Sequence, residues 1–165
     1  MSNDETQAVS LPEPLSLLAA NERAIEALYQ EFARQIPEYE DFWLSMSGEE
    51  RHHAEIIERL ATGSKTAAIL QPRFKVEPIR AFSQYVREQQ AFARQGTTMA
   101  AAISTAYYIE TALMERRFFE QLPQQIPAVA WAMTTLTKDT ERHVEIVKDA
   151  LTKVRAAAKE LPDQK

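Results

Sequence analysis

The stretch GEERHHAEIIERL, residues 48–60, sets Glu50 and His53 three residues apart among helix-forming residues. Ninety residues later the chain repeats the pattern as KDTERHVEIVKDA, residues 138–150, which aligns His143 with His53. Residues three apart on a helix lie on the same face, so each copy predicts one polar face on a long helix. The second copy carries Thr140 where the first carries Glu50.

The composition favours helices and limits the chemistry of any site. The chain has 165 residues, three glycines and no cysteine, which is typical of one all-α domain. Without thiolates, a metal ion would have to be held by carboxylate and imidazole groups. The net charge of −5 provides no concentrated basic face, so we expect no nucleic-acid partner.

The amino-terminal residues differ from the rest of the chain. MSNDETQAVSLPEP is polar and acidic and lacks the apolar region of a signal peptide, so residues 1–13 are predicted to form a flexible tail ahead of a domain at 14–160. No apolar run approaches the roughly 18 residues that a membrane span requires. We therefore expect a cytoplasmic protein without a membrane partner.

Prolines divide the chain into four long helices and one shorter helix. The long helices are predicted at 14–35, 38–62, 97–121 and 126–159, and the shorter one at 78–96. Short loops within each pair and a long link between the pairs indicate two antiparallel hairpins. The predicted fold is an all-α four-helix bundle with a long crossover that contains the extra helix.

Each long helix has an apolar stripe that a polar side chain interrupts near its middle. Steps of three and four residues along the first helix read Leu15, Leu18, Glu22, Ile25, Tyr29, Phe32 and Ile36. The same steps place Glu50 and His53, then Glu110, then Thr140 and His143 on the stripes of the other helices. Packing the four helices would bring these side chains to one level of the core. His52 lies about 100° around its helix and is predicted to face solvent.

Three buried carboxylates at one level need a compensating cation, because an isolated buried ion costs several kcal/mol. A bound metal satisfies this need, and the candidate ligands are Glu22, Glu50, His53, Glu110 and His143. Two other interpretations remain open. A single Glu-x-x-His is common by chance, and a buried histidine can be held by hydrogen bonds alone. Tyr29, two turns beyond Glu22, is either core packing or a hydrogen-bond donor to a ligand carboxylate.

The motifs together resemble the rubrerythrin branch of the ferritin-like superfamily. The similarity runs over residues 15–155 through NERAIEALYQEFA, EERHHAEII, YYIETALMERRFF and TERHVEIV. This resemblance implies a non-haem di-iron carboxylate site inside a ferritin-like bundle. It also implies a reaction with oxygen or hydrogen peroxide, a homodimer or larger homo-oligomer, and, for this chain without cysteines, an external electron donor.

Two positions depart from the family pattern. Thr140 replaces the second Glu-x-x-His glutamate, and Leu113 stands where the peroxidases of the family have a further glutamate. Three carboxylates cannot neutralise two ferrous ions, so we expect a weakened dinuclear site or a single well-held ion. Asp139, four residues before His143, is a possible substitute ligand.

Three functions remain open at this point. The first is a peroxide- or oxygen-reacting iron oxidoreductase. The second is a metal-binding or iron-handling protein without turnover, and the third is a structural bundle that has lost its metal. Zinc or manganese suit the same ligands, because affinity order alone does not select iron.

Overall fold

The computed structural model describes residues 13–61, 76–116 and 125–160, and these residues are helical with short connections. The long helices are α1 (Glu13–Gln35), α2 (Glu40–Ala61), α5 (Met99–Arg116) and α6 (Pro127–Glu160), with the shorter α4 (Glu77–Ala93) and the 3-10 turn η1 (Pro37–Tyr39). The predicted all-α bundle is confirmed. Residues 1–12 of the predicted tail and residues 117–121 of the predicted third helix lie outside the described residues.

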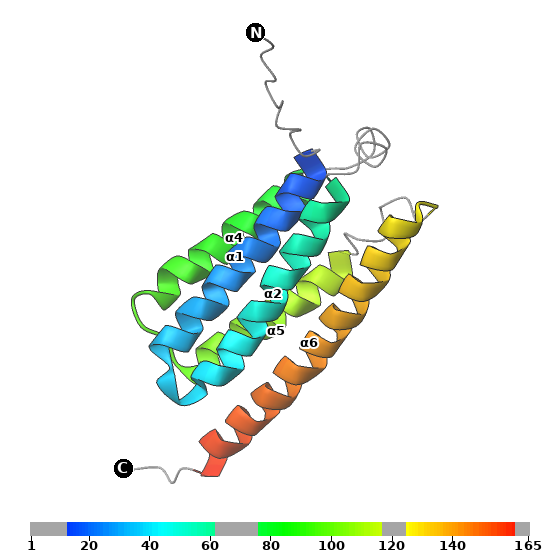
Figure 1. The fold of residues 1–165 in the computed structure, drawn as a ribbon. Coiled ribbons are helices and arrows are strands. Elements are labelled where there is room, and N and C mark those ends of the chain that lie inside the picture. Colours follow the sequence, from blue (N-terminus) through cyan, green and yellow to red (C-terminus); the bar gives the residue numbers. More distant parts are fainter. Residues whose placement is uncertain (1–12, 62–75, 117–124, 161–165) are drawn as a thin grey trace.

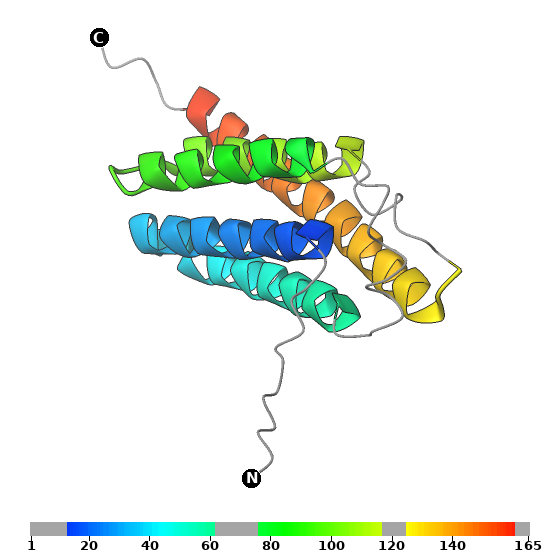
Figure 2. The same cartoon turned by 90° about the horizontal axis from the view of Figure 1, so that it is seen from above.

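Two antiparallel hairpins make the bundle. α1 packs against α2, α5 packs against α6, and α2 faces α6 across the interior (Figure 1). α6 is the longest helix, and it crosses the other helices at an angle (Figure 2). α4 packs chiefly against α1, where the Asn21 amide donates to the backbone carbonyl of Ile79 at 3.4 Å.

Proline and glycine account for the ends of the helices. Pro37 begins η1 and separates α1 from α2, and Pro127 is the first residue of α6, where its missing N–H costs no hydrogen bond. α4 ends at Ala93, before Gly96 with φ of 112°, a conformation that glycine adopts without strain. The predicted helix at 78–96 is therefore slightly too long at its carboxyl end.

The predicted stripes face the core. The six stripe residues on α1 are buried, and so is Ile36, which follows the end of this helix. On α2 the stripe that runs from Trp43 to Leu60 is buried as well. Trp43 packs against Phe32 and Tyr29, with ring centroids 4.8 and 5.5 Å apart. Met99, Ala150 and Val154 are only partly buried, and they line a pocket together with Tyr39 and Phe42. None of the helices in the described ranges is long and apolar enough to cross a membrane.

Candidate metal centre

Five polar side chains from four helices meet in the middle of the bundle. α1 supplies Glu22, α2 supplies Glu50 and His53, α5 supplies Glu110, and α6 supplies His143. None of the five exposes more than 3% of its surface. The stripe periodicity explains this convergence, because each residue replaces an apolar side chain at mid-helix.

These side chains form two groups that are each compact enough to hold a metal ion. Glu22, Glu50 and His53 make the first group, and Glu50, Glu110 and His143 make the second, with candidate ligand atoms within 4.8 Å of one another. Glu50 belongs to both groups. The two imidazole rings lie side by side, with centroids 5.4 Å apart.

The shared carboxylate turns one oxygen toward each histidine. Glu50 Oε2 lies 3.2 Å from Nδ1 of His53, and Glu50 Oε1 lies 2.9 Å from Nδ1 of His143. Nδ1 of His53 is 3.9 Å from Glu22 Oε2, and Nδ1 of His143 is 3.6 Å from Glu110 Oε2. Both imidazoles therefore present the same nitrogen to the interior.

Tyr29 fixes one oxygen of the Glu110 carboxylate. Its hydroxyl is fully buried and donates to Glu110 Oε1 at 2.7 Å. The other oxygen, Glu110 Oε2, has no hydrogen-bond partner and faces His143. Tyr29 thus orients the carboxylate and leaves Oε2 free to bind a cation.

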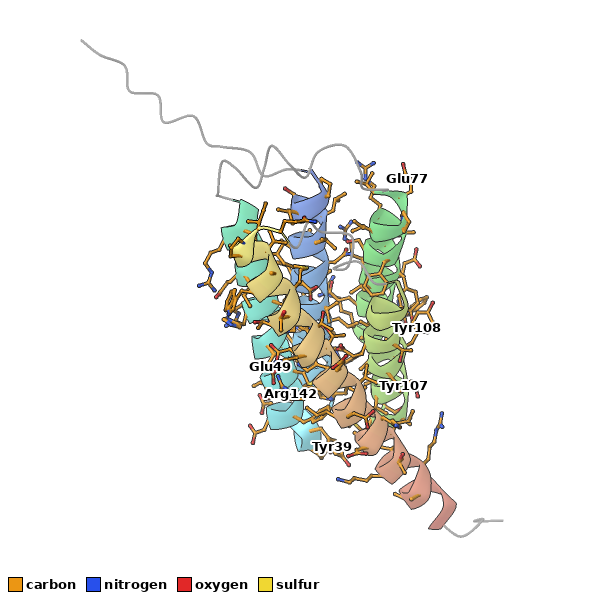
Figure 3. The ribbon with its side chains drawn as sticks, turned by 90° about the vertical axis from the view of Figure 1, so that its right-hand side faces the viewer. Tyr39, Glu49, Glu77, Tyr107, Tyr108 and Arg142 are labelled. Atoms are coloured by element: carbon orange, nitrogen blue, oxygen red, sulfur yellow. The ribbon has the colours of Figure 1, made fainter. Side chains whose placement is uncertain are left out.

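A carboxylate on the opposite helix holds the outer nitrogen of His143. Nε2 of His143 lies 2.9 Å from Oε2 of Glu49 on α2. When the imidazole is neutral, Nε2–H donates to Glu49, and this contact leaves the lone pair of Nδ1 directed into the site. Glu49 is itself tied to Arg142, whose guanidinium donates to both carboxylate oxygens (Figure 3).

Asp139 occupies the matching place beside the other histidine. Its Oδ2 lies 3.4 Å from Nε2 of His53, and its Oδ1 accepts from Arg142 at 3.2 Å. Asp139 belongs to neither of the two groups that could hold a metal ion. Its carboxylate faces His53 on the neighbouring helix α2.

Thr140 and His52 complete the positions that the motifs single out. Thr140 is buried, and its hydroxyl donates to the backbone carbonyl of Leu136 at 2.9 Å. His52 is exposed, as predicted, and lies beside Glu55 at the surface. The side chain of Leu113 lies outside the described residues.

Without a metal ion, the buried carboxylates and imidazoles of the cluster balance their charges by gaining or losing protons. Burial, reinforced by the Glu50 carboxylate, holds the pKa of Glu22 well above its usual range and raises that of Glu110. Burial opposes the ionisation of Glu50, but its contacts with both imidazoles outweigh this effect and hold its pKa well below its usual range. Burial would lower the pKa of His143, whereas Glu110 and Glu50 raise it to about 11.

The unpaired atoms of the cluster fit a metal ion. Glu22 Oε2 and Glu110 Oε2 are buried and have no hydrogen-bond partner, and Glu50 Oε1 and His143 Nδ1 are buried and make a close ion-pair contact with each other. The candidate ligand atoms of each group lie within 4.8 Å of one another, close enough for one ion to be held by all three side chains. Oxygen and imidazole donors suit iron, manganese and zinc. The chemistry of the donor set thus agrees with a metal centre.

Comparison with protein-family models decides the family. The Rubrerythrin family model matches residues 15–151, which is most of the chain. The chain belongs to the rubrerythrin family. It matches no curated protein and no solved structure. Membership in the rubrerythrin family makes the bundle ferritin-like, and the family typically contains non-haem iron.

Two polar residues of this rubrerythrin-family site are absent from the sequence-based list, Glu49 and Arg142. The sequence contains a signal for the first. Glu49 stands four residues before His53, as Asp139 stands four residues before His143, so an acidic residue precedes each histidine at the same spacing. The signal for Arg142 is weaker, because an exposed arginine on a helix is common.

Proposed function

We propose that the protein is a non-haem iron protein of the rubrerythrin family whose buried centre reacts with hydrogen peroxide or oxygen. The proposed ligands are Glu22, Glu50, His53, Glu110 and His143. The observation that carries the proposal is the position of Glu50, which directs one oxygen into each of two compact groups of buried ligand atoms. This arrangement supports two adjacent ions that share one carboxylate.

The polypeptide contributes orientation, burial and proton control. Bound iron would supply the redox chemistry. Tyr29 holds Glu110 by a hydrogen bond, and Glu49 directs Nδ1 of His143 inward. Asp139 and Glu49 are about 28% and 29% exposed, so they lie between the dry ligand cluster and solvent. A small oxidant would reach the centre along this side, between α2 and α6.

The electrons would come from an external donor. Residues 1–165 contain no cysteine, so a thiolate-ligated iron carrier lies outside this sequence. We further propose a homodimer or larger homo-oligomer, in keeping with the tendency of rubrerythrin-like proteins to assemble. The domain at 14–160 would then be the repeated unit.

A direct test combines metal analysis with turnover. The metal-free protein would be titrated with ferrous ion without oxygen, and then exposed to peroxide in the presence of a reduced dye as electron donor. We expect one to two ions per chain and peroxide-dependent oxidation of the dye. A His53→Gln variant should lose at least one ion, whereas the neighbouring exposed His52→Gln variant should bind and react like the parent protein. Failure of the parent protein to bind iron, manganese or zinc would overturn the proposal.

Thr140 favours a second candidate function, the binding or handling of iron without turnover. The threonine removes one carboxylate that a dinuclear centre of this family would use, and its hydroxyl is committed to the Leu136 carbonyl. In that case the protein would bind ferrous ion, and His53→Gln would weaken this binding, but peroxide would not be consumed. The same titration therefore distinguishes the two candidates.

A further inference from the structure

At the Glu-x-x-His ligand positions, the two halves of the candidate centre differ only in the first residue. Glu50 stands one turn before His53 on α2, and Thr140 stands one turn before His143 on α6. Thr140 is 4% exposed, so its side chain lies in the interior beside the cluster and not at the surface. A glutamate at this position would extend a carboxylate beyond the point where the threonine side chain ends.

The remaining protein groups leave the centre short of negative charge. Glu22, Glu50 and Glu110 supply three charges, whereas two divalent ions carry four. Each ion would also receive only three protein side chains, which leaves coordination positions open. The Thr140 hydroxyl does not complete the set, because it donates to the Leu136 carbonyl and carries no charge.

The nearby acidic residues are already paired elsewhere. Asp139 lies against the outer nitrogen of His53 and accepts a hydrogen bond from Arg142. Glu49 lies against the outer nitrogen of His143 and also accepts a hydrogen bond from Arg142. Glu141 is exposed. Within residues 13–61, 76–116 and 125–160, no further acidic side chain joins either metal-holding group. If two divalent ions are bound, a fourth negative ligand would therefore come from solution.

We propose that Thr140 creates a binding site for a small monocarboxylate, of the size of formate, which completes the two-metal centre in place of the missing glutamate. The inference rests on the proposed metal-binding function. Formate corresponds closely to the carboxylate that distinguishes glutamate from threonine at this position, so larger acids should bind less well. Arg142 pairs with both Glu49 and Asp139, so it offsets part of their negative charge on the side where an anion would enter.

The test measures metal binding rather than turnover. The metal-free protein would be titrated with Co²⁺ by calorimetry and visible absorption, with millimolar sodium formate or with sodium chloride of equal ionic strength. We expect formate to raise the affinity for the second Co²⁺ ion by about tenfold or more. Formate should also change the absorption of the bound cobalt, and propionate should have a much smaller effect than formate.

Three variants distinguish the effect of side-chain size from the effect of side-chain charge at position 140. Thr140→Glu should bind two ions without formate and should not respond to it. Thr140→Gln fills the same space without charge, so it should neither gain the second ion nor respond to formate. Thr140→Val keeps the space of the parent protein, so its formate response should persist. Circular dichroism would check that each variant is folded.

The outcomes distinguish this inference from the function on which it rests. If Co²⁺ binds but formate changes neither the affinity nor the spectrum of the parent protein and Thr140→Val, the anion site is overturned and the metal centre stands. If Thr140→Glu responds to formate as strongly as the parent protein does, the anion binds elsewhere and the inference is also overturned. If no Co²⁺, iron or manganese binds in any condition, the proposed function itself fails.

Discussion

Glu49 on α2 holds the outer nitrogen of His143 on α6, with Oε2 and Nε2 2.9 Å apart. Asp139 on α6 faces the outer nitrogen of His53 on α2 at 3.4 Å. Each helix thus carries a candidate metal-binding histidine and, four residues earlier, the carboxylate that faces the histidine of the other helix. Arg142 joins the two carboxylates, so α2 and α6 are connected on the solvent side of the site by charged contacts.

Removing the charge of Glu49 should weaken metal binding without unfolding the protein. In Glu49→Gln the contact to Nε2 becomes weaker, and the imidazole is less firmly oriented and less basic. We expect the affinity for the ion beside His143 to fall by about 10- to 100-fold. Competition with a chromophoric chelator would measure this. Glu141→Gln, an exposed change on α6 close to His143, is the control, and an equal loss there would contradict the assigned role of Glu49.

Tyr29 should stabilise the metal-free fold through its hydrogen bond to Glu110. Tyr29→Phe keeps the ring packed against Trp43 but leaves the buried Glu110 Oε1 without a donor. The free energy of unfolding should fall by about 1–3 kcal/mol, measured by urea denaturation. Tyr107→Phe removes a hydroxyl from a partly buried tyrosine on α5 and serves as the control. Equal stability of Tyr29→Phe and the parent protein would show that the hydrogen bond has no net effect.

Metal uptake should release protons, because protons and metal compete for the same atoms. With a pKa of about 11, His143 is protonated at neutral pH in the metal-free protein, and the raised pKa of Glu22 acts in the same direction. Metal affinity should therefore rise with pH. Calorimetry in buffers of different ionisation enthalpy would count the protons released. An affinity that does not change with pH would contradict the protonated state of the empty site.

The raised pKa of His143 also predicts how the stability of the metal-free protein varies with pH. The pKa of His143 is raised from 6.5 to about 11, so its contribution to stability is complete below pH 6.5 and is lost as pH rises through about 11. Glu50, whose pKa is lowered, contributes above its ordinary pKa of 4.5 and loses this contribution in acid. Urea denaturation across this range should show stability falling toward alkaline pH. His143→Gln should reduce that alkaline dependence.

The two tryptophans offer a matched test of the core. Trp43 is fully buried against Tyr29 and Phe32, whereas Trp131 on α6 is 61% exposed. Trp43→Ala should lower the free energy of unfolding by about 3–5 kcal/mol, because it leaves a cavity. Trp131→Ala should change it by no more than about 0.5 kcal/mol. Similar losses in both variants would mean that Trp131 is buried in an assembly, which sedimentation would reveal.

The sequence predicted the helices well because their signals are local. Alternating steps of three and four placed Glu22, Glu50 and His143 on apolar faces, and all three are buried. Errors in the helix boundaries are small and fall at turns. The extra helix at 78–96 ends earlier, before Gly96, since a helix end depends on backbone conformation more than on the apolar pattern.

The sequence by itself determined that the chain is all-α and that acidic and imidazole side chains enter its core, because helical period and burial are properties of each segment. Only the tertiary structure decided that Glu49 contacts the outer nitrogen of His143 and that Asp139 faces His53. It also decided that Glu50 belongs to both groups of candidate metal ligands. Those relationships join different helices. They depend on the angle and register at which α6 crosses α2, which arise from packing and not from any one segment.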